Sequence, residues 1–342
     1  MSPDSPVLQA VAAVLAVAAA VALGWAWDRG NCRSRLLYRP ALLALCLISA
    51  AATGLVWLNR QVDTYPTWAS LVGAKAAAAE AVPVHDRPGG GRILSLTVAG
   101  AASGLTMPMY VYLPADAEQH GERRYPVIEA LHGYPGSPLQ WLNKLGAAEI
   151  LDREIASGRM APTVVLFPYQ TPRPSLDTEC TNLVGGPQTE TFLTVDVPAF
   201  AKTRLPVRTG PGTWGLIGYS AGGYCATSLL LRHPGQYAAA ASLSGYSGPG
   251  IAVGDGSEHT TYDNAWRLRH LPVPAVALYL ASARTDRAAM RGTTAIADLV
   301  RAPMSVTTAF VRTGGHNAGT WRAMEPPAFA WLSQHLARPT TP

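Results

Sequence analysis

Two uncharged apolar runs at the start of the chain constrain most strongly what it can form. Residues 7–27 and 41–58 contain no acidic or basic side chain and consist mostly of Ala, Val and Leu. Their 21 and 18 residues are enough for each to cross a bilayer core of about 30 Å as a helix. A buried core helix, or a signal peptide for the first run, could have the same composition. We favour membrane helices, because the runs are nearly adjacent and no basic residue precedes the first.

The loop between the runs predicts their orientation. Residues 28–40 hold four arginines and one aspartate, and positively charged loops stay in the cytoplasm. Four aromatic residues lie near the ends of the runs, where interfacial aromatics belong: Trp25, Trp27, Tyr38 and Trp57. The sequence therefore predicts a transmembrane hairpin over residues 1–60 in the plasma membrane, with a cytoplasmic loop and an extracytoplasmic remainder.

The composition excludes several other classes of protein. With 48% hydrophobic and 14% charged residues, the chain is too apolar to be intrinsically disordered. Its formal charge of +5 could suggest nucleic-acid binding, but residues 1–60 account for +3 of it. The remaining 282 residues are nearly neutral at +2, so nucleic-acid binding has no electrostatic basis.

Strand-like and helix-like segments alternate after a connector over residues 61–91. Helices are expected at residues 139–157 and 221–232. Strands are expected at residues 92–98, 109–113, 125–131, 163–168, 214–217, 238–242, 275–281 and 306–312. Such alternation predicts an α/β domain over residues 92–342, with a mostly parallel sheet covered by helices on both faces. In such a domain the ligand site lies beyond the carboxyl ends of the strands.

A glycine-rich turn supplies a candidate nucleophile. Residues 218–222 read Gly-Tyr-Ser-Ala-Gly, between an apolar strand and an apolar helix. This is the context of the G-x-S-x-G nucleophile elbow, in which small neighbours let strand and helix approach closely around a strained serine. A plain glycine-rich turn is the alternative. We expect Ser220 to be the nucleophile.

The base should be a histidine that follows the last strand. His316 does so, within a Gly-Gly-His-Asn loop whose glycines let the imidazole reach the serine. A structural loop histidine would look the same in sequence. The other histidines after Ser220 are less suitable by position: His233, His259, His270 and His335.

The acid should lie between the serine and the histidine in the chain. Asp286 lies just past the strand-like residues 275–281, after the polar residues Ser282, Arg284 and Thr285. It would orient the imidazole and stabilise the imidazolium. Asp255, Asp263 and Asp298 are alternatives in a long loop or on a helix.

An oxyanion hole needs two backbone N–H groups. We expect one from Ala221, after the nucleophile, and one from Tyr134 in the loop after an early strand. Pro135 cannot donate. From loop placement alone, Trp141, Tyr169 and Tyr246 are expected to line the substrate pocket.

From about residue 92 to 336 the chain resembles the Putative esterase family of α/β hydrolases, which includes S-formylglutathione hydrolases, feruloyl esterases and actinobacterial mycolyltransferases. The matching segments are Ser103-Gly104, 110–114 (YVYLP), 131–136 (LHGYPG), 177–180 (DTEC), 218–226 (GYSAGGYCA), 243–246 (LSGY), 279–286 (YLASARTD) and 314–317 (GGHN). The resemblance implies an α/β-hydrolase fold, and the same catalytic trio of Ser220, Asp286 and His316. It also implies an oxyanion hole near Tyr134 and Ala221. The hairpin resembles membrane-anchored actinobacterial versions.

The four cysteines fall in two places. Cys32 and Cys46 lie in the predicted hairpin, and both are expected to be free. Cys180 and Cys225 lie in the outer domain, where conditions are oxidising. Both are expected near the same sheet edge, so they could form a disulfide or stay as two buried thiols. No spacing resembles a metal site, and no cofactor is expected.

These observations predict a membrane-anchored extracytoplasmic serine esterase that acts through a Ser-His-Asp triad and an acyl-enzyme. Its partner would be an ester, with a lipid or glycolipid suited to the membrane tether. One alternative is an acyltransferase that moves the acyl group to a sugar or lipid hydroxyl, because the same triad serves both. Others are a non-catalytic envelope protein with this fold, and a peptidase.

Overall fold

The structure is a computed structural model that describes residues 3, 5–29, 32–62, 65, 68, 90–117 and 122–340. The chain divides into two compact units, Met1–Lys75 and Ala76–Pro342. Apart from a few positions, the predicted connector at 61–91 lies outside the described residues.

The first unit is a pair of helices, α1 (Pro6–Ala26) and α2 (Cys32–Val62). Each contains a segment long and apolar enough to cross a membrane, Pro6–Ala26 and Arg35–Arg60. Helix α2 begins well before the predicted residue 41, so most of the expected loop at 28–40 is helical. Arginine and leucine favour helices, and the helix continues through Pro40.

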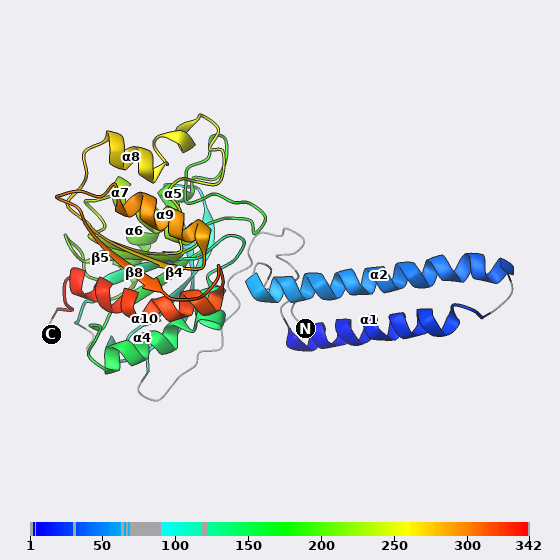
Figure 1. Ribbon diagram of the computed structural model, residues 1–342. Coiled ribbons are helices and arrows are strands. Elements are labelled where there is room, and N and C mark those ends of the chain that lie inside the picture. The colour runs from blue at the N-terminus through cyan, green and yellow to red at the C-terminus, as the bar shows by residue number, and fades with distance from the viewer. Residues whose placement is uncertain are drawn as a thin grey trace. The chain divides into compact units, whose positions relative to one another are not determined.

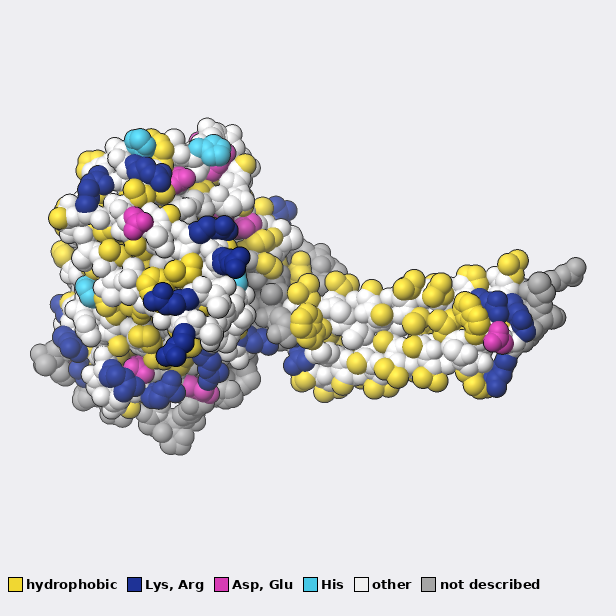
Figure 2. Space-filling model, in the orientation of Figure 1, with side chains coloured by type: hydrophobic (Ala, Val, Ile, Leu, Met, Phe, Trp, Pro, Cys, Tyr) yellow, Lys and Arg dark blue, Asp and Glu magenta, His cyan; other side chains and the backbone are white. Residues whose placement is uncertain are grey.

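Arginine–aromatic contacts occupy the turn between the two helices. The Arg29 guanidinium lies 3.3 Å from the centre of the Trp25 ring, and that of Arg39 lies 4.6 Å from Trp27. The Arg39 Nε–H also donates to the Trp27 carbonyl at 2.8 Å. Figure 2 shows hydrophobic side chains along the length of the hairpin and basic ones gathered at its turn.

The second unit is built on an eight-stranded sheet in the order β1-β2-β4-β3-β5-β6-β7-β8. Strands β1 and β2 pair antiparallel, as do β2 and β4, and the other neighbours are parallel. The strands are β1 (Arg92–Ala99), β2 (Thr106–Leu113), β3 (Val127–Leu131), β4 (Val164–Pro168), β5 (Trp214–Tyr219), β6 (Ala239–Leu243), β7 (Ala277–Ala283) and β8 (Ser305–Val311). The prediction of a mostly parallel α/β sheet is confirmed.

Helices cover both faces of the sheet (Figure 1). Helices α4 (Ala147–Ala156) and α10 (Ala318–His335) lie on one face, and α6 (Val197–Arg204), α7 (Ala221–Arg232) and α9 (Arg287–Ala297) on the other. The shorter segments are α5 (Thr189–Thr191), α8 (Asn264–His270), the 3-10 turns at Ala115–Ala117 and Ser257–His259, and the π-helical turns at Trp141–Leu145 and Phe192–Asp196.

The two helical layers explain the continuous apolar runs of the central strands. In β3, β4 and β5 every residue is buried, because side chains pointing to either face meet a helix. Leu216 belongs to the core on the α7 side, and its neighbour Ile217 belongs to the core on the α10 side. The sheet thus holds the carboxyl ends of β5, β7 and β8 at one rigid edge.

Candidate active site

The turn between β5 and α7 carries Ser220 in a strained backbone conformation. Ser220 has φ +55° and ψ −122° at the N-terminus of α7, a region that non-glycine residues rarely adopt. Its N–H donates to the Leu243 carbonyl of β6 at 2.9 Å. This bond fixes the turn to the neighbouring strand, and the side chain lies at the carboxyl edge of the sheet.

Glycines make the tight turn possible. A Cβ on Gly218 would lie 2.0 Å from the Gly222 carbonyl oxygen, and one on Gly222 would lie 2.1 Å from the Leu131 carbonyl oxygen. No larger residue fits at either position without moving backbone. The spacing of glycines around the serine therefore reflects the close approach of β3, β5 and α7.

The structure brings Ser220, His316 and Asp286 together although 96 residues separate the first two. The distance from His316 Nε2 to Ser220 Oγ is 2.7 Å, and that from His316 Nδ1 to Asp286 Oδ2 is 2.9 Å. The nucleophile–base and base–acid distances are those expected of a hydrogen-bonded triad. The serine and the aspartate are buried, whereas the imidazole is 43% exposed.

Neighbouring contacts hold the histidine and aspartate loops in place. Asp286 caps α9, because its Oδ1 accepts the Ala289 N–H at 3.1 Å. The Gly314 N–H donates to the hydroxyl of Thr285 at 2.9 Å, which ties the two loops to each other. The Trp321 ring packs edge-on against the imidazole, with 5.1 Å between centroids. The contact with Trp321 was not predicted from the sequence.

The loop after β3 lies against the nucleophile. A Cβ on Gly133 would lie 2.8 Å from the Tyr219 ring and 3.2 Å from Ser220 Cβ, so a glycine is needed for this approach. Tyr134 follows directly, and together with Ala221 it lines a pocket beside the serine. Both residues expected to form the oxyanion hole therefore lie at the same pocket wall.

The other histidines after Ser220 have different surroundings. His233 ends α7 and contacts the Glu190 carboxylate at 2.7 Å. His259 is largely exposed, and His270 and His335 end helices α8 and α10. In the described part of the chain, none of these four histidines forms a hydrogen bond with Ser220.

The alternative aspartates serve local turns. Asp255 accepts the Ser257 N–H in an exposed loop, and Asp263 caps α8 through the Trp266 N–H at 2.8 Å. Asp298 lies at the end of α9. Their positions leave Asp286 as the carboxylate that contacts His316.

None of the three aromatic residues expected in the pocket is among the residues that line it. Trp141 is completely buried in the core, against Tyr219, Phe167 and Phe329. Tyr169 packs edge-on against His132 and does not line the pocket. The hydroxyl of Tyr246 donates to Glu179, which does line the pocket.

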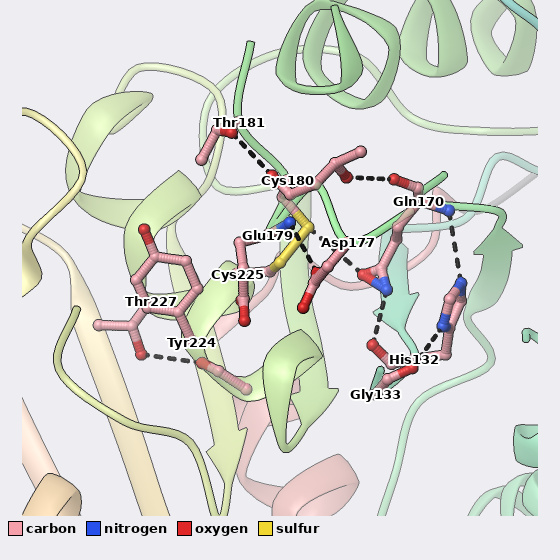
Figure 3. The surroundings of a disulfide bond; sticks show 12 residues. His132, Gly133, Gln170, Asp177, Glu179, Cys180, Thr181, Tyr224, Cys225 and Thr227 are labelled. Atoms are coloured by element: carbon pink, nitrogen blue, oxygen red, sulfur yellow. Dashed lines mark hydrogen bonds between the residues drawn. A yellow bond between two sulfur atoms is a disulfide. The ribbon is translucent and has the colours of Figure 1, made fainter. Parts of the chain in front are cut away.

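The structure joins Cys180 and Cys225 by a disulfide (Figure 3). It connects the loop after β4 to the nucleophile helix α7, and both cysteines line the pocket. Gln170 of the same loop donates through its side chain to the His132 carbonyl at 2.6 Å. The loop after β4 is therefore bonded both to helix α7, through the disulfide, and to the loop after β3, through Gln170.

Burial controls the charge of the pocket wall. Burial lowers the pKa of His132 to about 4, so its imidazole is neutral at physiological pH. Burial, and then the nearby Asp177 carboxylate, raise the pKa of Glu179 to about 8. Sequence reasoning missed Asp177 and Glu179 as site residues. The Asp-Thr-Glu-Cys segment at 177–180 could have pointed to them, because it is one of the segments that carry the family resemblance. No function was predicted for its acidic residues.

Comparison with known proteins gives this arrangement a family context. Residues 100–332 match the Esterase family, described as "Putative esterase". The chain is 25% identical over 235 residues to an uncharacterized protein of Corynebacterium glutamicum, which covers 65% of this chain and 54% of that protein. The chain thus spans about half the length of this curated relative.

Solved structures are similar over most of the second unit. A ferulic acid esterase superposes with a TM-score of 0.63 at 18% identity, over 73% of this chain and 100% of that one. An S-formylglutathione hydrolase from Agrobacterium tumefaciens gives 0.63 at 14% identity, over 75% and 100%. At these identities the similarity concerns the fold, which is that of the α/β hydrolases.

Proposed function

The chain belongs to the Putative esterase family, and from this premise we propose that it is a serine hydrolase of carboxylic esters. The observation that carries the proposal is the continuous contact from Ser220 Oγ through the His316 imidazole to Asp286, at 2.7 and 2.9 Å. This arrangement activates a hydroxyl for acyl transfer.

Acylation begins when Ser220 Oγ attacks the ester carbonyl carbon and its proton passes to His316 Nε2. Asp286 holds the Nδ1–H and stabilises the imidazolium. The tetrahedral oxyanion is held by the N–H groups of Tyr134 and Ala221, each contributing roughly 3 kcal/mol in the transition state. The carbon–oxygen bond to the alcohol then breaks, the alcohol leaves with the proton from His316, and an acyl-enzyme remains.

Deacylation repeats these steps with water. His316 takes a proton from a water molecule, the hydroxide adds to the acyl carbon, and Ser220 Oγ leaves with the proton. The 43% exposure of the imidazole supports water as the acceptor. We therefore place hydrolysis ahead of transfer to a sugar or lipid hydroxyl.

The two apolar helices support a membrane-anchored organisation. We propose a transmembrane hairpin over residues 1–60, a linker over 61–91 and a catalytic domain over 92–342. The arginines of the loop at 28–40 would keep it in the cytoplasm, so the catalytic domain would lie outside the plasma membrane. A lipid-linked ester would suit an enzyme held near the bilayer.

The test uses the full-length protein in detergent and p-nitrophenyl esters of increasing chain length. Ser220→Ala should lower kcat by roughly 10⁴-fold or more. Ser305→Ala, at the exposed start of β8, should keep wild-type activity. Adding glycerol and analysing the products distinguishes free acid from acyl-glycerol. Equal hydrolysis by wild type and Ser220→Ala would refute the proposal, and acyl-glycerol as the main product would assign the chain as a transferase.

A further inference from the structure

His132 begins the loop after β3 and is buried, with only 2% of its surface exposed. Its ring nitrogen Nδ1 lies 2.8 Å from the carbonyl oxygen of Gly133. The other ring nitrogen, Nε2, accepts the backbone N–H of Gln170 at 3.4 Å. The Gln170 side chain also donates to the His132 carbonyl at 2.6 Å. Figure 3 shows His132 between Gln170 of the loop after β4 and Gly133.

These partners allow only one position for the proton of the neutral ring. A backbone N–H can only donate, so Nε2 of His132 must be the unprotonated nitrogen. A carbonyl oxygen can only accept, so Nδ1 carries the proton and donates it to Gly133. Burial lowers the pKa of His132 to about 4, which keeps the ring in this neutral form at physiological pH.

The Gly133 carbonyl belongs to the same peptide group as the Tyr134 N–H, the expected donor to the oxyanion. This peptide group is trans, so its C=O and its N–H point in opposite directions. A bond that fixes the carbonyl on one side therefore fixes the direction of the N–H on the other. Accepting a hydrogen bond also polarises the peptide group and strengthens its N–H as a donor.

The order of the strands places Ser220 on the correct side of this peptide group. Strand β3 lies between β4 and β5. The imidazole of His132 is bonded to the loop after β4, whereas Ser220 follows β5. The Gly133 carbonyl faces the imidazole, so the N–H of Tyr134 points away from it, toward the side of β3 on which Ser220 lies.

We infer that His132 is a positioning residue that sets the direction and the donor strength of the Tyr134 N–H in the oxyanion hole. Both of its ring nitrogens have partners, so it acts through the peptide group and not by proton transfer with the substrate. The inference rests on the proposed esterase function, because it adds a residue to the same reaction.

The test compares His132→Leu with His132→Asn in the full-length protein. The two new side chains have nearly the same shape, but only asparagine keeps an N–H at the position of Nδ1. The readouts are kcat/KM for p-nitrophenyl acetate and the affinity for trifluoroacetone, whose adduct with Ser220 carries an oxyanion in the same place. The end point of fluorophosphonate labelling counts the active sites, so misfolded protein does not enter the rates.

His132→Leu should lower kcat/KM roughly 10²-fold and weaken trifluoroacetone binding by a similar factor, because the Tyr134 N–H loses its fixed direction. His132→Asn should stay within about fivefold of wild type. Gln170→Met removes the bond to the His132 carbonyl and should lower both readouts about fivefold. His259→Leu, the same change at an exposed histidine, should alter neither readout.

Three results would overturn the inference: wild-type kcat/KM in His132→Leu, equal losses in His132→Leu and His132→Asn, or a lower kcat/KM without weaker trifluoroacetone binding. If His132→Leu gives no labelled enzyme, unchanged readouts in Gln170→Met overturn it. Failure of the esterase proposal looks different, since the wild type would then hydrolyse the ester no faster than Ser220→Ala.

Discussion

At the residue scale, Glu129 places a carboxyl group in the middle of β3 with no solvent exposure. The Tyr237 hydroxyl donates to its Oε2 at 2.5 Å. Burial raises the pKa of Glu129 to about 8, and this hydrogen bond offsets only part of that shift. The folded protein therefore holds a proton on Glu129 that the unfolded chain releases near pH 4.5.

This difference in proton binding predicts how stability changes with pH. The contribution of Glu129 is fully present below pH 4.5 and is lost as the pH rises toward about 8. Each unit of pKa difference corresponds to about 1.4 kcal/mol. In thermal unfolding of the full-length protein between pH 5 and 8, Glu129→Gln should lose less Tm than wild type. Exposed Glu122→Gln should follow wild type, and equal slopes for all three proteins would contradict the role of Glu129.

At the scale of elements, the nucleophile turn depends on how closely β3, β5 and α7 approach one another. At Gly222 a Cβ would lie 2.1 Å from the carbonyl oxygen of Leu131 and 2.6 Å from that of His132. Both neighbours are backbone of β3 and its following loop, so neither can rotate away. The same backbone positions the expected oxyanion donor at Tyr134.

Gly222→Ala should therefore destabilise the protein and its site together. We expect a loss of about 3 kcal/mol, which corresponds to a fall in Tm of roughly 6–12 °C, and a large loss of esterase activity. Gly235→Ala is the matched control, because a Cβ there meets no atom within 4 Å. Differential scanning fluorimetry of both variants checks this. If Gly222→Ala and Gly235→Ala had the same Tm, the turn would accommodate a Cβ at residue 222, and this would contradict the close approach described above.

Local patterns predicted the elements well and the pocket poorly. The helix at Ala221–Arg232 has the predicted bounds, since an apolar strand, a glycine turn and an apolar helix leave little choice of register. Trp141 was expected in the pocket but lies in the core, because chain position does not reveal which face of the sheet a turn covers. The contact of Glu179 with Tyr246 joins loops after two different strands. Only the assembled sheet brings these loops together.

At the scale of the whole molecule, the net charge is distributed unevenly between the apolar hairpin and the α/β-hydrolase unit. Residues 1–60 carry a balance of +3, and the rest is nearly neutral at +2. Four of the five arginines of residues 1–60 lie in the loop at 28–40, between the two uncharged apolar runs. In the proposed anchored enzyme, this positive loop would therefore lie inside the cell.

The orientation is tested by labelling single cysteines in intact cells with a membrane-impermeant maleimide. The starting protein carries Cys32→Ser and Cys46→Ser. Leu36→Cys, exposed near the hairpin turn, should react only after the cells are permeabilised. Gln334→Cys, exposed on α10, should react in intact cells. Labelling of Leu36→Cys in intact cells would place the arginine loop outside and reverse the proposed topology.

The central claim is that Ser220 is the nucleophile of an esterase, and covalent trapping tests it most directly. The full-length protein is treated with a fluorophosphonate, digested and mapped by mass spectrometry. The account predicts one adduct, on the peptide that contains Ser220. It also predicts that the adduct disappears in Ser220→Ala, and that it forms much more slowly in His316→Gln, which lacks the base. An adduct on another residue, or equal labelling of Ser220→Ala, would contradict the account.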